Sequence, residues 1–95
     1  MACEELVLRA RADIEAGRPR EAALQTRIAL EAALAELGGG EAATELAGAR
    51  DAVARAANEA LAGPPAPALQ EDVAAAVTAI ETALRRRRLG RDAGQ

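Results

Sequence analysis

Apolar residues along this chain recur at the three- and four-residue spacing of an α-helix, and turns rich in glycine and proline interrupt them. The interruptions fall at residues 17–19, 38–40 and 63–67. No segment alternates apolar and polar residues in the manner of a β-strand. Because short loops join antiparallel neighbours, the pattern predicts an all-α fold, a small antiparallel bundle of about four helices. These helices are expected over residues 2–16, 19–37, 41–62 and 68–89.

The second helix carries apolar residues on two sides, so it is expected to contact two neighbours and to lie at the centre of the bundle. Its first stripe comprises Ala23, Leu30, Leu34 and Leu37. Its second stripe comprises Leu24, Ile28, Ala32 and Ala35. Both stripes are expected to face neighbouring helices.

The third helix is expected to pack through a narrow seam made mainly of alanine, which lets another helix approach closely. The seam comprises Leu46, Ala49, Val53, Ala56 and Ala60. Gly48 lies within this segment and weakens a helix by about 1 kcal/mol relative to alanine. It therefore marks either a close contact or a frayed first turn.

The last helix carries the strongest apolar stripe of the chain. The stripe comprises Leu69, Val73, Val77, Ile80 and Leu84 and forms a possible self-association seam. It packs either within the chain or against a second copy. Gly90 is expected to end this helix, so residues 1–90 are predicted to form a single helical domain and residues 91–95 a frayed C-terminal tail.

Composition limits the size of the core. Of the 95 residues, 51% are apolar, but most of these are alanine, and Phe, Tyr and Trp are absent. Eighteen larger aliphatic residues remain, each contributing about 1.5–3 kcal/mol when fully buried. Small proteins with thin cores commonly gain stability by oligomerisation, so we expect a homodimer.

The residue types present leave little catalytic chemistry. His, Ser and Lys are absent, which removes the commonest general base and two common nucleophiles. Catalysis would need converging carboxylates, for example Asp13, Glu31 and Glu45, and the periodicity gives no sign of them. Without His the metal sites typical of helical bundles cannot form, and Glu41 beside Glu45 is better explained by the helix dipole. We therefore expect no enzyme and no catalytic, cofactor-binding or metal-binding residues.

A run of four arginines, Arg85, Arg86, Arg87 and Arg88, offers a possible anion-binding site for nucleic acid or for an acidic protein. Three features weigh against nucleic acid: consecutive helical residues point in different directions, no aromatic side chain accompanies them, and the net charge is −3. The run is also explained as a solvated helix C-terminus matched to the dipole, with Glu81 and Arg85 paired at i,i+4.

The segment Gly17-Arg18-Pro19-Arg20-Glu21-Ala22, followed by Ala29-Leu30, resembles the turn and second helix of a tetratricopeptide-type hairpin. The resemblance covers about residues 10–31 and implies that the first two helices form a hairpin with close packing at small residues. The aromatic positions of that family have no aromatic residue here, and no second copy of the repeat is present, whereas about three are normally needed. The resemblance therefore implies no ligand site.

The sequence predicts a non-catalytic helical interaction or structural module that self-associates as a homodimer. The alternative is a small regulatory adaptor that binds an anionic partner through Arg85–Arg88. The single Cys3 fits a cytoplasmic protein. We expect neither a transmembrane helix nor a signal peptide, because no apolar stretch is long enough and the first residues are acidic.

Overall fold

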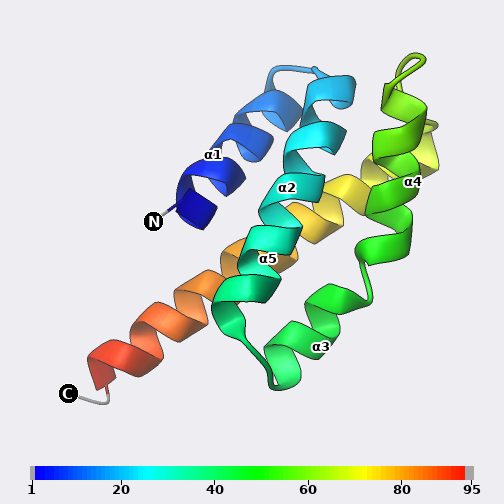
Figure 1. The fold of residues 1–95 in the computed structure, drawn as a ribbon. Coiled ribbons are helices and arrows are strands. Elements are labelled where there is room, and N and C mark those ends of the chain that lie inside the picture. The colour runs from blue at the N-terminus through cyan, green and yellow to red at the C-terminus, as the bar shows by residue number, and fades with distance from the viewer. Residues whose placement is uncertain (1, 94–95) are drawn as a thin grey trace.

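The computed structural model describes the backbone of residues 2–93 and the side chains of residues 3–90, and it confirms the all-α fold (Figure 1). No strand occurs in that part of the chain. The helices are α1 (Ala2–Glu15), α2 (Pro19–Leu37), α3 (Glu41–Ala47), α4 (Arg50–Ala60) and α5 (Pro67–Ala93).

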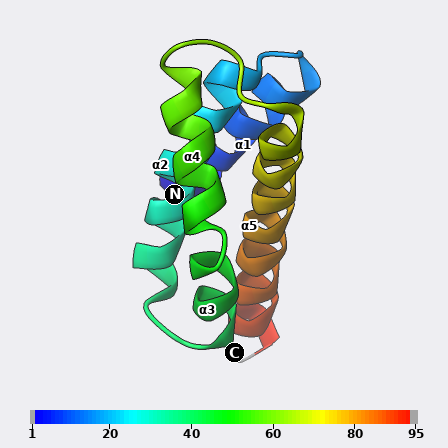
Figure 2. The same ribbon diagram turned by 90° about the vertical axis from the view of Figure 1, so that its right-hand side faces the viewer.

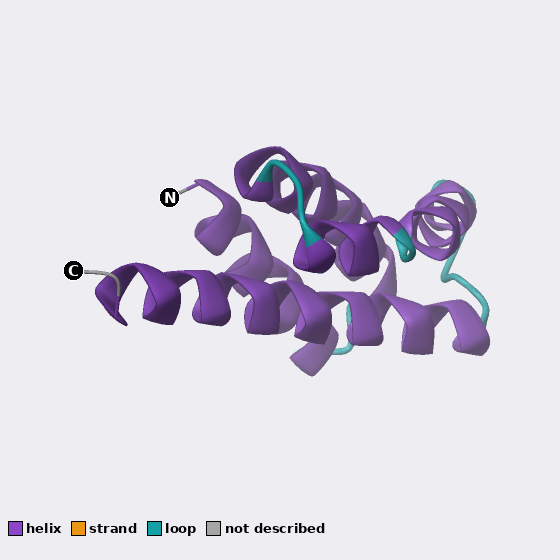
Figure 3. Cartoon of the chain, turned by 90° about the horizontal axis from the view of Figure 1, so that it is seen from below, coloured by secondary structure: helices purple, strands orange, loops and turns teal. Residues whose placement is uncertain are grey.

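Helices α2 and α4 lie side by side, the long helix α5 crosses behind them, and α1 packs along the other side of α2 (Figure 1). A quarter turn shows α5 standing apart from α4 and α2 on the other side of the core (Figure 2). From below, α2, α3 and α4 lie on one side of α5, while α1 passes across α5 and ends on its other side (Figure 3). Helix α2 contacts each of the other four helices, which confirms its predicted central place.

The turn between α1 and α2 forms as the sequence predicts. Gly17 has a φ of 73°, in the left-handed region that favours glycine. The backbone N–H of Arg18 donates to the carbonyl of Asp13 at 2.8 Å, which closes the end of α1. Pro19 begins α2 at the position where a missing N–H leaves no hydrogen bond unmade. The two helices therefore form an antiparallel hairpin.

The prediction of one continuous helix over residues 41–62 is wrong, because the helix is interrupted at Gly48 and forms α3 and α4. The N–H of Gly48 donates to the carbonyls of Thr44 and Glu45, and the N–H of Ala49 donates to the carbonyl of Leu46. The i→i−4 hydrogen bonds of the α-helix therefore give way to tighter i→i−3 bonds, and α3 ends. A Cβ at Gly48 would lie 3.2 Å from the carbonyl oxygen of Glu45, so the turn suits glycine. The break gives α3 and α4 separate directions, and both still pack against α2 and α5.

The apolar stripe of α5 packs within the chain. Its members are buried side chains, with exposed fractions of 8% or less: Leu69, Val73, Val77, Ile80 and Leu84. The possible self-association seam predicted on this helix is therefore covered by the chain's own α1, α2, α3 and α4. Gly90 does not end the helix, which continues to Ala93. The predicted tail lies partly in this extension, and residues 94–95 lie outside the described residues.

Helix α2 buries mainly small side chains, which corrects the predicted assignment of its faces. The buried residues are Ala22, Ala23, Thr26, Ala29, Leu30 and Ala33. In the second predicted stripe, Leu24 and Ile28 are exposed to solvent, whereas Ala32 packs partly buried against the core. Alanine at the contacts lets α1, α4 and α5 approach the backbone of α2 closely, and this close packing selects the buried face.

Candidate interaction surface

The outer side of α2 carries an exposed apolar stripe, which we call the α2 stripe. It comprises Leu24, Ile28, Ala32 and Ala35. Leu24 is 38% exposed and Ile28 is 54% exposed, Ala35 is exposed and Ala32 is partly buried. Spacings of four, four and three residues align these side chains along one face of the helix. No helix covers α2 on the side nearest the viewer in Figure 1, because α5 lies behind it and α1 and α4 lie beside it.

Two charged residues lie along one edge of the α2 stripe. Arg27 is exposed and forms none of the ion pairs found in the described part of the chain. Glu31, one turn further on, accepts two hydrogen bonds from Arg50 of α4, at 2.8 and 2.6 Å. These hydrogen bonds hold the pKa of the Glu31 carboxylate below its ordinary value. The edge therefore presents an acid held by Arg50 and, one turn before it, an exposed arginine whose charge also favours the Glu31 carboxylate.

Other large exposed apolar residues are isolated from one another. Leu8 belongs to α1, Leu61 to the loop after α4, and Leu89 to the far end of α5. Single exposed leucines are common on protein surfaces, whereas large contiguous apolar patches with a polar rim are typical of interaction surfaces. Among the described side chains, the α2 stripe is the place where two large exposed aliphatic residues share one helix face.

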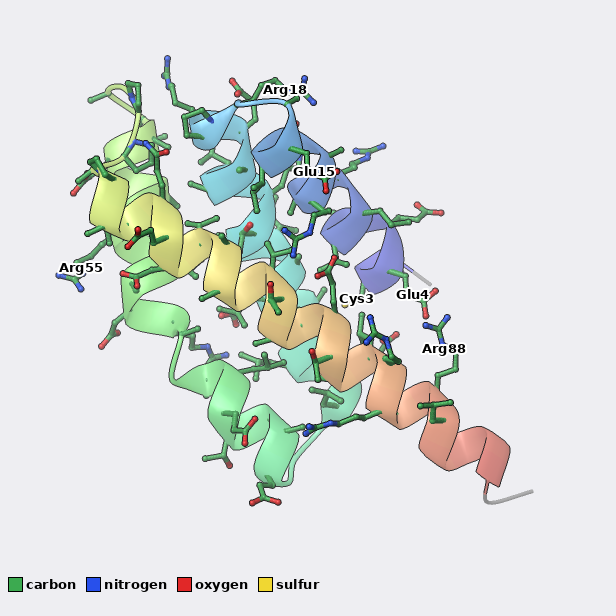
Figure 4. The ribbon with its side chains drawn as sticks, turned by 180° about the vertical axis from the view of Figure 1, so that it is seen from behind. Cys3, Glu4, Glu15, Arg18, Arg55 and Arg88 are labelled. Atoms are coloured by element: carbon green, nitrogen blue, oxygen red, sulfur yellow. The ribbon has the colours of Figure 1, made fainter. Side chains whose placement is uncertain are left out.

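The arginine run does not converge on one site. Arg87 donates from Nη1 to the carbonyl oxygen of Glu36 at 2.5 Å. Arg86 lines a hollow beside α3, and Arg85 and Arg88 line another beside α1. Arg88 lies near Glu4 in Figure 4, so that hollow carries both signs of charge. The four side chains thus point to at least three surroundings, as consecutive helical residues must.

An ion pair that the sequence pattern does not indicate links α1 to α5. Glu81 was expected to pair with Arg85, but it accepts two hydrogen bonds from Arg11 of α1, at 3.2 and 2.8 Å. Arg11 also donates to the hydroxyl of Thr78. This contact joins α1 to α5 across 70 residues of sequence, and no local pattern could have indicated it.

The carboxylates considered for catalysis lie in separate places. Asp13 pairs with Arg18 at the α1–α2 turn, at 2.8 Å. Glu31 pairs with Arg50, and Glu45 lines the small hollow beside α3 and α5. Within the described residues, no three His, Cys, Asp or Glu side chains are grouped so that they could hold a metal ion.

Cys3 is a buried thiol on the inner side of α1, where Figure 4 shows it between α1 and α5. Its sulfur lies 3.9 Å from the carbonyl oxygen of Ala29 on α2. Burial raises the pKa of the thiol, and the nearby carboxylates of Glu36 and Glu4 raise it further. A buried thiol with a raised pKa is a poor nucleophile, so Cys3 acts as a small apolar residue in the packing.

The largest hollows are open and shallow. One of about 480 Å³ lies beside the triple glycine and is bordered by Glu31 and Arg50, which neutralise each other. Another of about 380 Å³ lies between the Gly17 turn and the start of α5. Its arginine, Arg18, is already paired with Asp13. Glu71 also borders the second hollow, so each hollow holds a neutralised charge pair or a single carboxylate and no converging set of polar groups that would fix a small ligand.

No protein-family model, curated protein or solved structure matches this chain. The tetratricopeptide-type resemblance therefore stays a prediction. None of the described helices is long and apolar enough to cross a lipid bilayer.

Proposed function

We propose that this protein is a non-catalytic helical interaction module that self-associates as a homodimer through the α2 stripe. The observation that carries the proposal is the exposure of Leu24 and Ile28 on the central helix, while smaller residues of the same helix are buried. Covering these two side chains removes apolar surface from water, which is the main driving force of association. The single buried thiol at Cys3 fits a cytoplasmic setting for this module.

The surface available to a partner is small, so the association is weak. A standard protein interface buries about 800 Å² on each partner, and one helix face with two large side chains offers less than that. We expect a dissociation constant of about 10–100 μM. The alternative, an adaptor for an anionic partner at Arg85–Arg88, has less support because those side chains diverge and meet acidic neighbours.

Sedimentation equilibrium of the purified protein at tens to hundreds of micromolar tests the proposal. The wild type should fit a monomer–dimer equilibrium. Ile28→Asp should abolish the dimer, because it places a charge in the middle of the apolar stripe. Leu61→Asp is the matched control: it adds the same charge at an exposed, isolated leucine and should leave the dimer intact.

A strict monomer throughout this concentration range would contradict the proposal. Equal loss of the dimer in both variants would show that net charge, and not the α2 stripe, controls association.

A further inference from the structure

We infer that the second copy docks antiparallel on α2, with a two-fold axis near Ile28, and that Arg27 and Glu31 fix this register by pairing between the two copies. The inference rests on the proposed self-association and specifies the orientation and the charged residues that select the partner. A two-fold interface uses the same patch on both copies, so each contact occurs twice.

The side-chain sizes along the α2 stripe are complementary about Ile28. In an antiparallel pair, residues equally distant from the axis lie opposite one another. Leu24 is four residues before Ile28 and Ala32 is four residues after it, so each large Leu24 lies against the small Ala32 of the second copy. Ile28 packs against itself across the axis. This alternation of large and small residues lets the two helices approach to an ordinary packing distance.

The charges at the edge of the stripe are complementary in the same register. An antiparallel pair sets each edge of one helix beside the same edge of the other. Arg27 of one copy and Glu31 of the other are then separated by two residues, about 3 Å, along the helix axis. A flexible arginine side chain spans this separation. Arg27 is exposed without an ion-pair partner in the described structure. Glu31 already accepts from Arg50, and its carboxylate has acceptor capacity for a further donor.

Other registers lose these matches. Moving the axis toward the C-terminus by one and a half residues would set Ile28 against the charge of Glu31. In a parallel pair, the edge with Arg27 would lie beside the opposite edge of the second copy, which carries Gln25 and Ala32. That edge has no carboxylate near Arg27. A parallel pair would also align the two helix dipoles in the same direction, whereas an antiparallel pair opposes them.

Charge reversal tests the pairing. Arg27→Glu and Glu31→Arg should each weaken self-association by about tenfold, because each sets like charges together at two symmetric places. An equimolar mixture should recover association to near the wild-type level, since each variant supplies the charge that the other lacks. Arg55→Glu is the control: it makes the same charge change on the exposed face of α4 and should have no effect. A mixture that stays as weak as the separate variants would overturn the pairing.

Disulfide cross-linking tests the orientation. Ile28→Cys should cross-link to itself, and a mixture of Glu21→Cys with Ala35→Cys should cross-link as a heterodimer, because both positions lie seven residues from the axis. Ala35→Cys alone should not cross-link, since its two copies are about 21 Å apart along the axis and a disulfide needs Cα atoms within about 7 Å. The wild type controls for Cys3, which is buried.

The outcomes separate this inference from the proposed function. Cross-linking of Ala35→Cys to itself would show a parallel pair and overturn the inference, while the dimer through the α2 stripe would stand. A dimer in solution that gives none of these cross-links would place the interface elsewhere and overturn both.

Discussion

The two faces of helix α2 differ in how fully their side chains are covered. The inner face buries five alanine or threonine side chains and Leu30, and Leu34 and Leu37 pack partly buried against the same core, whereas the outer face exposes Leu24 and Ile28. If burial followed side-chain size alone, the larger residues would face the core. Close packing of α1, α4 and α5 on the inner face favours small side chains there. Leu24 and Ile28 on the outer face stay exposed to solvent.

The largest expected difference between the two faces is in stability, when an aspartate replaces a residue of the inner face or one of the outer face. Leu30 is 1% exposed and Ile28 is 54% exposed, two residues away. Leu30→Asp should unfold the protein, with a loss of about 4 kcal/mol or more, because it buries an unpaired charge. Ile28→Asp should change the stability of the monomer by no more than about 0.5 kcal/mol. Thermal melts followed by circular dichroism at low protein concentration measure both, and equal losses would show that the outer face is part of the core.

A second contrast adds bulk to each face. Ala29 is fully buried against α1, and Ala35 is exposed on the α2 stripe. Ala29→Leu should destabilise the protein by about 1–3 kcal/mol through overpacking. Ala35→Leu should leave the monomer unchanged and tighten the dimer, because it adds apolar surface to the contact. Chemical denaturation and sedimentation check these two results. A tolerated leucine at Ala29 would mean that the alanine contacts are loose.

The smallest effect concerns the one polar residue on the inner face. Thr26 is fully buried, and its hydroxyl oxygen has no hydrogen-bond partner. Thr26→Val keeps the shape and removes an unsatisfied polar group, so it should raise the stability by about 1 kcal/mol. Thr44→Val is the control, because the Thr44 hydroxyl donates to the carbonyl of Gly40 at 3.0 Å, and its loss should give no gain. A lower melting temperature for Thr26→Val would show that the hydroxyl is satisfied in solution.

The sequence predicted those parts of the fold that depend on local chemistry. The turns at Gly17 and at residues 63–67 follow from the conformations that glycine and proline allow or forbid, and three of the four predicted helices begin and end within a few residues of the observed ones. Gly48 was ambiguous, since a single glycine inside an alanine-rich helix is often tolerated. The pattern alone could not show that the helix breaks there and that α3 and α4 each pack against α2 and α5.

The sequence indicated which residues form the candidate surface, but it could not indicate that this stripe is exposed to solvent. Periodicity identified Leu24, Ile28, Ala32 and Ala35 as a stripe, but it weighs each residue by its hydrophobicity and cannot tell which stripe meets a neighbour. The Arg11–Glu81 pair also lay beyond prediction, because its partners are 70 residues apart. The five residues of the α5 stripe are all buried, and the structure shows that the chain itself covers them.

The most direct test of the account is a dilution series of isoleucine methyl NMR spectra. The chain has three isoleucines: Ile14 is partly buried, Ile28 is exposed on the α2 stripe, and Ile80 is fully buried. The account predicts that the Ile28 methyl signal shifts with concentration over tens to hundreds of micromolar, while the Ile80 signal stays fixed. An Ile28 signal that does not move with concentration would contradict the claim that the outer face of α2 binds a second copy.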